Sequence, residues 1–517
     1  MSFIFDILES LAIAALIPLS GWRLLHYFQL ESYQLPGYYR SLKRNAKKAL
    51  LPGLAMAAVG VLAAVLGLAS VLRMALMALM AGWLFVQAKN EKLKKPFVVT
   101  ERVKRLIAMH AATAFVIALV VRFALPLVLW CLLPAFEAAL IALAAVCAQP
   151  IEKHINQQFV DDAKKRLEKN PNLIKIGITG SYGKTSTKFL LRDILSVKFN
   201  VLATPSSFNT TMGVTRVIRE QLMPGHQVFI AEMGARHVGD IKELVDLVHP
   251  TVGLLTSVGP QHLDTFGTIE RIKNTKYELI DGLPQNGTAI LARDGAICEE
   301  LYHRCPLEKK YMPGDLMTAS DMEWGPFGTR FTLTDVETGE SARCETRLLG
   351  EHSIANLLLC CTAARTLGMT PAEIATGVAR CQPVEHRLEL LNGGGGVSII
   401  DDAFNANPVG AKAALRVLKN FPGRRIIITP GMVELGGEEA QFNREFGEQM
   451  ADSVDVAILV GRRHTQPIVD GLTEKGFPQE KIHVVSSLEE STKVLHAMMQ
   501  AGDVVLYEND LPDNYSE

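Results

Sequence analysis

The fold of this chain is decided by the stretch Gly180-Ser181-Tyr182-Gly183-Lys184-Thr185-Ser186-Thr187. It follows the apolar run 173–179 and precedes the helix-like run 188–195. A strand, a glycine-containing turn and a helix in this order present backbone N–H groups to phosphates. Lys184 would reach the β and γ phosphates of a nucleotide, and the hydroxyl of Thr185 or Ser186 would bind Mg²⁺.

The loop has a short Gly-x-x-Gly-Lys-Thr form, because the first glycine of the eight-residue motif would fall at Ile178. Taken alone, it is also compatible with an ordinary strand-to-helix turn that carries a solvated lysine. Residues further along the chain have to decide between a nucleotide site and such a turn.

Composition limits the class of protein. A length of 517 residues predicts two or three domains, and 53 basic against 54 acidic residues give no indication of nucleic-acid binding. The eight cysteines form no Cys-x-x-Cys pair. This argues against a structural zinc site or a disulfide framework and fits a reducing compartment.

Residues 1–150 are predicted to form a transmembrane domain of about five helices. The apolar stretches are 4–22, 50–88 and 106–148, and the second and third are each long enough for two spans. A cleaved signal peptide does not fit, because the first stretch has no cluster of positive charge at its start.

The charges between these stretches predict an orientation. Two loops are basic, one with Arg23, Arg40, Lys43, Arg44, Lys47 and Lys48, the other with Lys89, Lys92, Lys94, Lys95, Arg102, Lys104 and Arg105. The positive-inside rule makes both loops cytoplasmic, so everything after residue 150 is cytoplasmic in a multi-pass protein of a bacterial inner membrane. Topology alone explains the basic loops; the alternative is recognition of an anionic lipid or a lipid-linked phosphate.

Residues 151–172 are predicted to be an amphipathic connecting helix, after which polar candidates follow the phosphate loop in order. Glu232 ends the apolar run 228–231, where a carboxylate beside a phosphate loop would contact Mg²⁺; the alternative is a solvent-facing strand end. Considered separately, His262 would be polar surface and Lys276 a solvated lysine on a helix.

Together, these pieces resemble the central domain of the Mur ligases, which are ATP-dependent amide ligases, and most of all the members that add D-alanyl-D-alanine to the peptidoglycan precursor. The resemblance covers about residues 173–465. Besides the phosphate loop, it rests on Ser207-x-Asn209, Glu232-Met233-Gly234, 259–263, Lys276-Tyr277-Glu278, Gly350-x-His352-x-x-x-Asn356, His386-Arg387, 401–408 and 432–436.

The resemblance implies a role for each matching residue. ATP would be held by Gly180, Ser181, Gly183, Lys184, Thr185, Ser186, Asn209, Asn356, Arg387, Asp402, Asn405 and Asn407. Mg²⁺ would be bound by Thr185, Glu232 and His262, which reverses the first interpretation of His262. Lys184, Lys276 and His262 would be catalytic, and Lys276 matches the lysine that this family carbamylates.

The predicted fold class is α/β behind the helical membrane domain. Residues 173–388 would be a Mur ligase-like ATP-binding central domain. Residues 389–517 alternate strand-like and helix-like runs, which indicates a doubly wound, Rossmann-like C-terminal domain.

The chain departs from the family pattern at two points that bear on substrates. Membrane spans stand where Mur ligases have the domain that binds a uridine nucleotide, so the acceptor is expected to be a membrane lipid or a lipid-linked carboxylate. The C-terminal Lys-Gly-Ser segment is replaced by 507–513, which is acidic. This replacement suggests an amine other than D-alanyl-D-alanine, such as a cationic one.

The predicted function is therefore a membrane-anchored ATP-dependent ligase in cell-envelope biosynthesis. It would activate a carboxylate as an acyl phosphate and join it to the amine of an amino acid or short peptide. Two alternatives are a polymerising ligase of the poly-γ-glutamate type and a non-ligating membrane ATPase.

Overall fold

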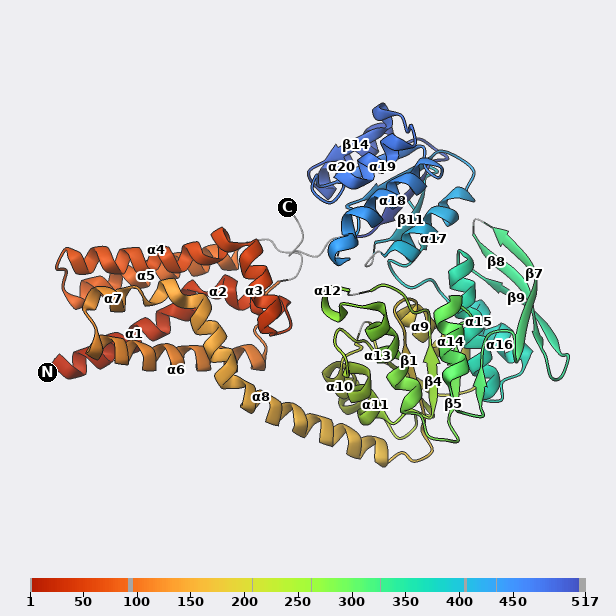
Figure 1. Cartoon of the computed structure of the whole chain (residues 1–517), viewed down its shortest axis with the longest axis horizontal. Helices are drawn as coiled ribbons and strands as arrows, with labels where there is room; N and C mark the ends of the chain where they lie inside the picture. Colours follow the sequence, from red (N-terminus) through yellow and green to blue (C-terminus); the bar gives the residue numbers. More distant parts are fainter. Residues whose placement is uncertain are drawn as a thin grey trace. The chain divides into compact units, whose positions relative to one another are not determined.

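The computed structural model describes residues 2–91, 96–206, 208–261, 263–325, 327–403, 407–433 and 435–510 (Figure 1). The described chain divides into two compact units, one ending at Gln157 and the other beginning at Gln158. Each unit is considered by itself below.

The first unit is helical. Its elements are α1 Ser2–Ser20, α2 Trp22–Leu30, α3 Leu35–Arg44, α4 Ala46–Val65, α5 Ser70–Lys89, α6 Glu101–Ala124, α7 Leu127–Cys131, the 3₁₀ turn η1 Leu133–Phe136 and α8 Glu137–Glu168. Among the described residues, four helices are long and apolar enough to cross a membrane, or five if α1 and α2, which are bent by 53° at Gly21, form one span. The expected number of apolar segments is therefore present, and a bilayer around them stays a prediction.

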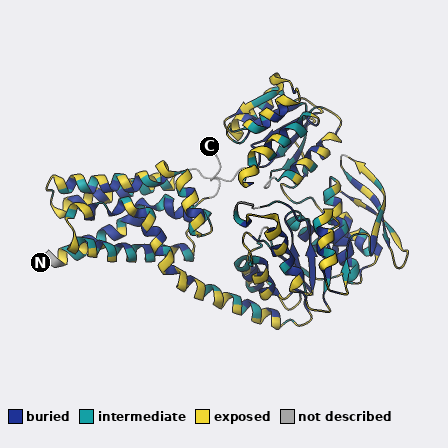
Figure 2. Ribbon diagram, in the orientation of Figure 1, coloured by how far each residue is buried: buried dark blue, intermediate teal, exposed yellow. Residues whose placement is uncertain are grey.

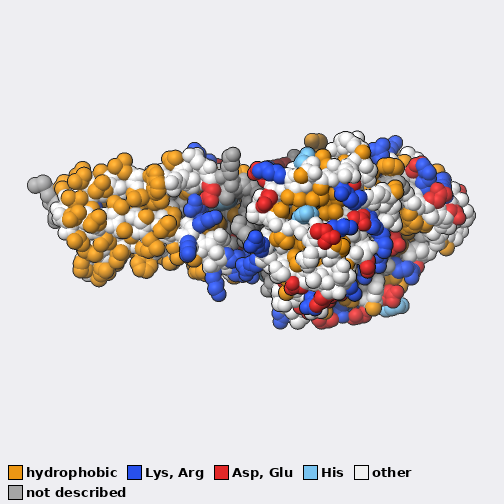
Figure 3. Space-filling model, turned by 90° about the horizontal axis from the view of Figure 1, so that it is seen from above, with side chains coloured by type: hydrophobic (Ala, Val, Ile, Leu, Met, Phe, Trp, Pro, Cys, Tyr) orange, Lys and Arg blue, Asp and Glu red, His pale blue; other side chains and the backbone are white. Residues whose placement is uncertain are grey.

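Apolar side chains cover the face of this unit that Figure 3 shows, and Figure 2 marks many residues on the outside of its helices as exposed. Val71 and Leu79 on α5 are 78% and 71% exposed, whereas the small residues Ala81 and Ala114 lie inside. Monomeric soluble proteins rarely expose a contiguous apolar surface of this size. Lys and Arg gather at one end of the unit in Figure 3.

Four of the charged residues that interrupt the apolar stretches form ion pairs. Arg73 on α5 lies 2.5 Å from Glu9, and Arg122 on α6 lies 2.6 Å from Asp6, both acids being on α1. Arg73 and Glu9 are almost completely buried. Ion pairs of this kind lower the cost of placing charge in an apolar bundle and join α1 to α5 and α6.

The last apolar stretch and the predicted connecting helix form one element. Helix α8 runs from Glu137 to Glu168 with Pro150 inside it. Its end belongs to the second unit, because Ala163 and Leu167 lie in the core of the following sheet. The separate connecting helix predicted at 151–172 is thus the continuation of the last apolar helix.

A parallel six-stranded sheet, with strand order β2-β3-β1-β4-β5-β6, forms the centre of the next domain. The strands are β1 Ile174–Thr179, β2 Val201–Ala203, β3 Val228–Glu232, β4 Val252–Leu255, β5 Thr288–Leu291 and β6 Lys310–Tyr311. The helices are α9 Lys184–Leu195, α10 Thr211–Gln221, α11 Asp240–Val248, α12 Leu263–Phe266, α13 Ile269–Asp281, α14 Gly295–Arg304, α15 Glu351–Thr366 and α16 Pro371–Arg380. Separate apolar cores cover the two faces of the sheet.

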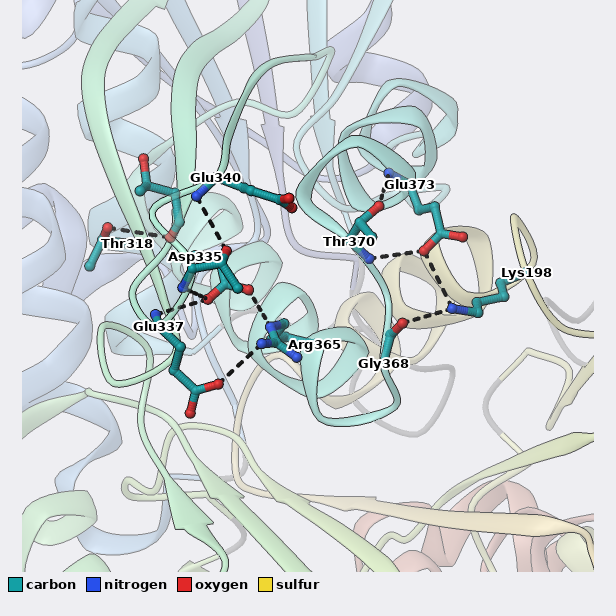
Figure 4. Close-up of polar contacts among 11 residues, drawn as sticks. Lys198, Thr318, Asp335, Glu337, Glu340, Arg365, Gly368, Thr370 and Glu373 are labelled. Carbon is teal, nitrogen blue, oxygen red and sulfur yellow. Dashed lines mark hydrogen bonds and ion pairs between the residues drawn. The ribbon is translucent and has the colours of Figure 1, made fainter.

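A three-stranded antiparallel sheet, which the sequence analysis did not anticipate, packs against this domain. It contains β7 Met317–Gly325, β8 Gly328–Asp335 and β9 Ser341–Thr346. Figure 4 shows how polar contacts hold it: Arg365 of α15 pairs with Asp335 and Glu337. Asp335 is buried and also accepts hydrogen bonds from the backbone N–H groups of Glu337 and Thr338.

The C-terminal domain contains a six-stranded sheet of order β10-β11-β15-β12-β13-β14, parallel except for β10. The strands are β10 Glu389–Asn392, β11 Ser398–Asp402, β12 Arg425–Thr429, β13 Val456–Val460, β14 Ile482–Val485 and β15 Val504–Glu508. The helices are α17 Pro408–Lys419, α18 Glu439–Ala451, α19 Gln466–Glu474 and α20 Leu488–Met498, with 3₁₀ turns η2 Gly436–Glu438 and η3 Gln479–Lys481. The predicted doubly wound architecture is confirmed.

The buried position of Asp335 generates a stability prediction. Arg365→Ala leaves the carboxylate buried without its cation, so we expect the free energy of unfolding to fall by about 2 kcal/mol. Hydrogen exchange of the β9 amides measures this locally. Arg330→Ala is the matched control, because Arg330 and its partner Glu345 are both exposed. Equal exchange in the two variants would contradict the proposed role of Arg365.

Candidate active site

The turn after β1 has room only for glycine at two positions. Gly180 and Gly183 have φ angles of +148° and +79°. A Cβ on Gly180 would lie 1.9 Å from the hydroxyl oxygen of Thr256. That hydroxyl donates to the carbonyl of Tyr182, and the N–H of Ser181 donates to Ser257 O at 2.7 Å. The end of β4 therefore shapes the loop, and the predicted strand, turn and helix are present.

Lys184, the first residue of α9, folds back over this loop. Its ammonium donates to the carbonyls of Gly180 and Ser181, at 2.7 and 2.9 Å. Removal from water lowers the pKa of Lys184 to about 8, an effect that the Glu232 carboxylate opposes and the Arg387 guanidinium reinforces. The lysine is thus placed among the atoms that would surround a bound phosphate.

Glu232 at the end of β3 is the centre of the site. Its carboxylate, 1% exposed, accepts hydrogen bonds from Lys188 at 2.9 Å, Thr185 at 3.1 Å and Asn209 at 3.1 Å. Burial alone would raise the pKa of Glu232, but the charges of Lys188 and Lys184 hold it below its ordinary value. The structure therefore brings together three predicted residues, Thr185, Asn209 and Glu232, around an ionised carboxylate.

Two predicted residues, His262 and Asn405, lie outside the described part of the chain. Within the described ranges there is no group of three His, Cys, Asp or Glu that could hold a metal ion. Thr185 and Glu232 nevertheless supply a hydroxyl and a carboxylate within 3.1 Å of each other. Oxygen ligands of this type suit Mg²⁺, which is usually bound by one or two carboxylates together with phosphate oxygens.

Lys188 is a site residue that the sequence analysis missed. Its side chain is fully buried, pairs with Glu232 and also donates to the carbonyl of Ser206. A signal was present, because Lys188 lies three residues before Leu191 on the face of α9 that is otherwise apolar. A lysine on such a face needs a buried acidic partner.

Lys276 on α13 is buried, contrary to what a helix lysine suggests by itself. It is 2% exposed, and no hydrogen bond or ion pair joins its amine to another described residue. Burial, followed by the nearby charge of Lys184, lowers the pKa of Lys276 well below its ordinary value. This direction favours the uncharged form of the amine, which is the nucleophilic form.

Three other predicted residues contact the loop or cap a helix. The Asn356 side chain on α15 lies against Gly183, 2.7 Å from where a Cβ would be. Ser181 donates to the carbonyl of Gly259, and Asn407 accepts from the N–H of Gly410 as the cap of α17. Ser186 is half-buried in the first turn of α9.

Arg387 lies near acidic groups of both domains: Glu232 of the central domain, and Asp402 and Glu508 of the C-terminal domain. Its pKa is lowered by burial, and the charges of Asp402, Glu232 and Glu508 oppose the change. The flanking residues His386 and Leu388 have φ angles of +60° and +45°, which non-glycine residues rarely adopt. A strained connection thus carries Arg387 at the junction of the central and C-terminal domains.

Comparison with known proteins identifies this arrangement. The family model for the Mur ligase middle domain matches residues 178–364, and that for the Mur ligase glutamate ligase domain matches residues 386–507. The UDP-N-acetylmuramoyl-tripeptide–D-alanyl-D-alanine ligase of Mycobacterium tuberculosis is 31% identical over 365 residues, which are 64% of this chain and 69% of that protein. The chain belongs to the Mur ligase family.

Two further relatives agree with this assignment. The Bacillus subtilis enzyme of the same name is 28% identical over 338 residues, covering 64% of this chain and 72% of its own length. The crystal structure of MurF ligase from Thermotoga maritima in complex with ADP has a TM-score of 0.61 at 26% identity, covering 69% of this chain and 80% of that one. The predicted enzyme class, an acid–amino acid ligase, is confirmed at the level of the Mur ligase family.

The burial of the Lys188–Glu232 pair predicts the effect of removing the lysine. Lys188→Met leaves a buried carboxylate without its nearest cation, so we expect the free energy of unfolding to fall by about 3 kcal/mol. Denaturant unfolding measures the loss. Arg192→Met, at a partly exposed position of the same helix, is the control.

The same variant has a predicted pH dependence. In the wild type, the lowered pKa of Glu232 gives stability that is present above the carboxyl's unfolded-state pKa and is lost on acidification. Without Lys188, burial raises that pKa, so the deficit of Lys188→Met should shrink as the pH falls. A deficit that is independent of pH would contradict the assignment of Lys188 as the partner of an ionised Glu232.

Proposed function

We propose that this protein is a membrane-anchored, ATP-dependent ligase that activates a carboxylate as an acyl phosphate and joins it to an amine. The observation that carries the proposal is the meeting of Lys184, Thr185, Asn209 and Glu232 at the end of a parallel sheet. Ligands bind at this edge in α/β folds. The relative from Thermotoga maritima is described in complex with ADP, which supports ATP as the nucleotide.

The residues have separable roles in the proposed reaction. The N–H groups of the loop and Lys184 hold the phosphates, because Lys184 would exchange two carbonyl partners for a negatively charged one. Thr185 and Glu232, with His262, would hold Mg²⁺, which neutralises charge on the phosphoryl group. Asn209 is bonded to Glu232 and positioned to orient the γ-phosphate.

Lys276 is proposed to act after carbamylation. An uncharged buried amine can attack carbon dioxide through nitrogen, losing a proton and forming a carbamate. The product carries a carboxylate, which is the type of group that positions magnesium. The burial of Lys276, without a described partner, supports this role.

Residues from the domain junction are proposed to complete the nucleotide site. Asn356 would contact the adenine, while Arg387 and Asp402 would close over the ribose and phosphates, with Asn405 and Asn407 nearby. Arg387 is close enough to Lys184 for its charge to lower the pKa of that lysine. Positioning and charge stabilisation would supply most of the catalysis.

The proposed substrates follow from a comparison of the helical unit of this chain with the names of its relatives. The family models begin at residue 178, and the preceding part of this chain is an apolar helical unit. The relatives are named for a UDP-N-acetylmuramoyl tripeptide and for D-alanyl-D-alanine. For this chain we propose a membrane lipid or lipid-linked carboxylate as acceptor, and an amino acid or short peptide as amine, in the cell envelope at the cytoplasmic face of the membrane.

Hydroxylamine trapping tests this function. Purified protein in native lipid with Mg²⁺, ATP and hydroxylamine should form a hydroxamate on the acceptor, because hydroxylamine attacks an acyl phosphate. Lys184→Ala should lower the rate by at least about a hundredfold, as the loss of a phosphate-stabilising cation predicts, whereas Lys198→Ala, on the surface after α9, should not.

The products of this experiment distinguish the proposed ligase from a ligase with a soluble acceptor, a non-ligating ATPase and a polymerising ligase. A hydroxamate on an extracted lipid would support the proposed acceptor, and one found only on a soluble uridine-linked peptide would refute it. ATP turnover without hydroxamate or amine dependence would refute the ligase and favour a non-ligating ATPase. With a natural amine, a ladder of products would indicate polymerisation, and a single product one addition.

A further inference from the structure

Glu508, in the segment that replaces the Lys-Gly-Ser of the family pattern, does not face solvent. It ends β15, is 1% exposed, and lies in register with Asp402 at the end of the adjacent parallel strand β11. A cationic amine from solvent therefore cannot reach it directly. The partner of Glu508 is Asp402, to which it is hydrogen-bonded.

Two carboxyl groups in a hydrogen bond need a proton between them. The guanidinium of Arg387 is the cation whose charge acts on both Asp402 and Glu508. The neighbouring Asp401 has a different partner, His386, at 2.7 Å. One cation balances one ionised carboxylate. Two buried carboxylates in contact would also repel each other, as in the paired acids of aspartic proteases.

The hydrogen-bond partners show which acid holds the proton. Asp402 accepts a hydrogen bond from the N–H of Leu388 at 3.1 Å, as an ionised carboxylate does readily. Oε2 of Glu508 is buried and has no hydrogen-bond partner in the described structure. An oxygen without a donor is much less costly on a neutral acid than on a carboxylate.

We propose that Glu508 is a positioning residue: it keeps its proton, donates a hydrogen bond to the Asp402 carboxylate, and thereby fixes Arg387 beside the phosphate loop. The proposal rests on the proposed function, since it gives Arg387 a phosphate to meet. Asp402 is held on one side by Glu508 and on the other by the N–H next to Arg387. The side chain that closes on the nucleotide is thus oriented before the nucleotide binds.

The directions in which the pKa values of Glu508 and Asp402 are shifted agree with this assignment of the proton. Burial, and then the charge and hydrogen bond of Asp402, raise the pKa of Glu508 well above its ordinary value. Burial raises the pKa of Asp402 to about 6, against the effects of Arg387, the Leu388 N–H and Glu508. Both directions favour a proton on Glu508 and a negative charge on Asp402.

Infrared spectroscopy of the full chain in lipid tests the proton without any nucleotide. The wild-type spectrum at neutral pH should contain a carboxylic-acid carbonyl band that Glu508→Gln removes. Asp503→Asn is the matched control, because Asp503 is a buried acid at the other end of the same strand and is ionised by its pairing with Arg424. If the band is absent, or unchanged in Glu508→Gln, the proposal is wrong.

Calorimetric titration with Mg-ADP tests the effect on Arg387. Glutamine donates a hydrogen bond as protonated Glu508 does, so Glu508→Gln should bind within about twofold of the wild type, whereas Glu508→Ala should bind about tenfold more weakly. Equal weakening of both variants would show that the proton of Glu508 is not what matters. If the wild type binds no Mg-ADP, the nucleotide function falls and the role of Arg387 with it, while the infrared band still decides the protonation of Glu508.

Discussion

The catalytic unit depends on the hydrogen bonds and the ion pair that the buried Glu232 carboxylate forms. It lies at the end of β3 and takes donors from α9 and from the loop after β2: Lys188, Thr185 and Asn209. Burial by itself would protonate this acid, and the adjacent ammonium groups keep it ionised. The same bonds that fix the helix against the sheet therefore also produce an oxygen site suited to a magnesium ion.

A second charged cluster lies across the domain junction, and Arg387 connects the two. On one side its charge acts on Lys184 and Glu232, and on the other on Asp402 and Glu508. The segment that carries it is strained at His386 and Leu388. Strain held by surrounding contacts is a common feature of ligand clamps. Arg387, at the junction, therefore lies under the influence of acidic groups from both domains.

The helical unit differs from the ligase domains in the kind of side chain that it exposes. Its outside is apolar, and its core is apolar as well, with Ile13, Met77 and Trp130 buried. Asp6, Glu9, Arg73 and Arg122, which lie within its apolar helices, pair with one another.

The sequence by itself determined the strand, turn and helix of the phosphate loop, the doubly wound C-terminal sheet and the candidate residues Thr185, Asn209 and Glu232, because glycine spacing, apolar periodicity and strand-end carboxylates are local properties. It did not reveal the buried states of Lys188 and Lys276, the three-stranded sheet at 317–346, or the pairing of Glu508 with Asp402. Each of these depends on residues far apart in the chain. Whether a charged side chain is solvated, paired or neutral is a property of its surroundings, and only the tertiary structure supplies those.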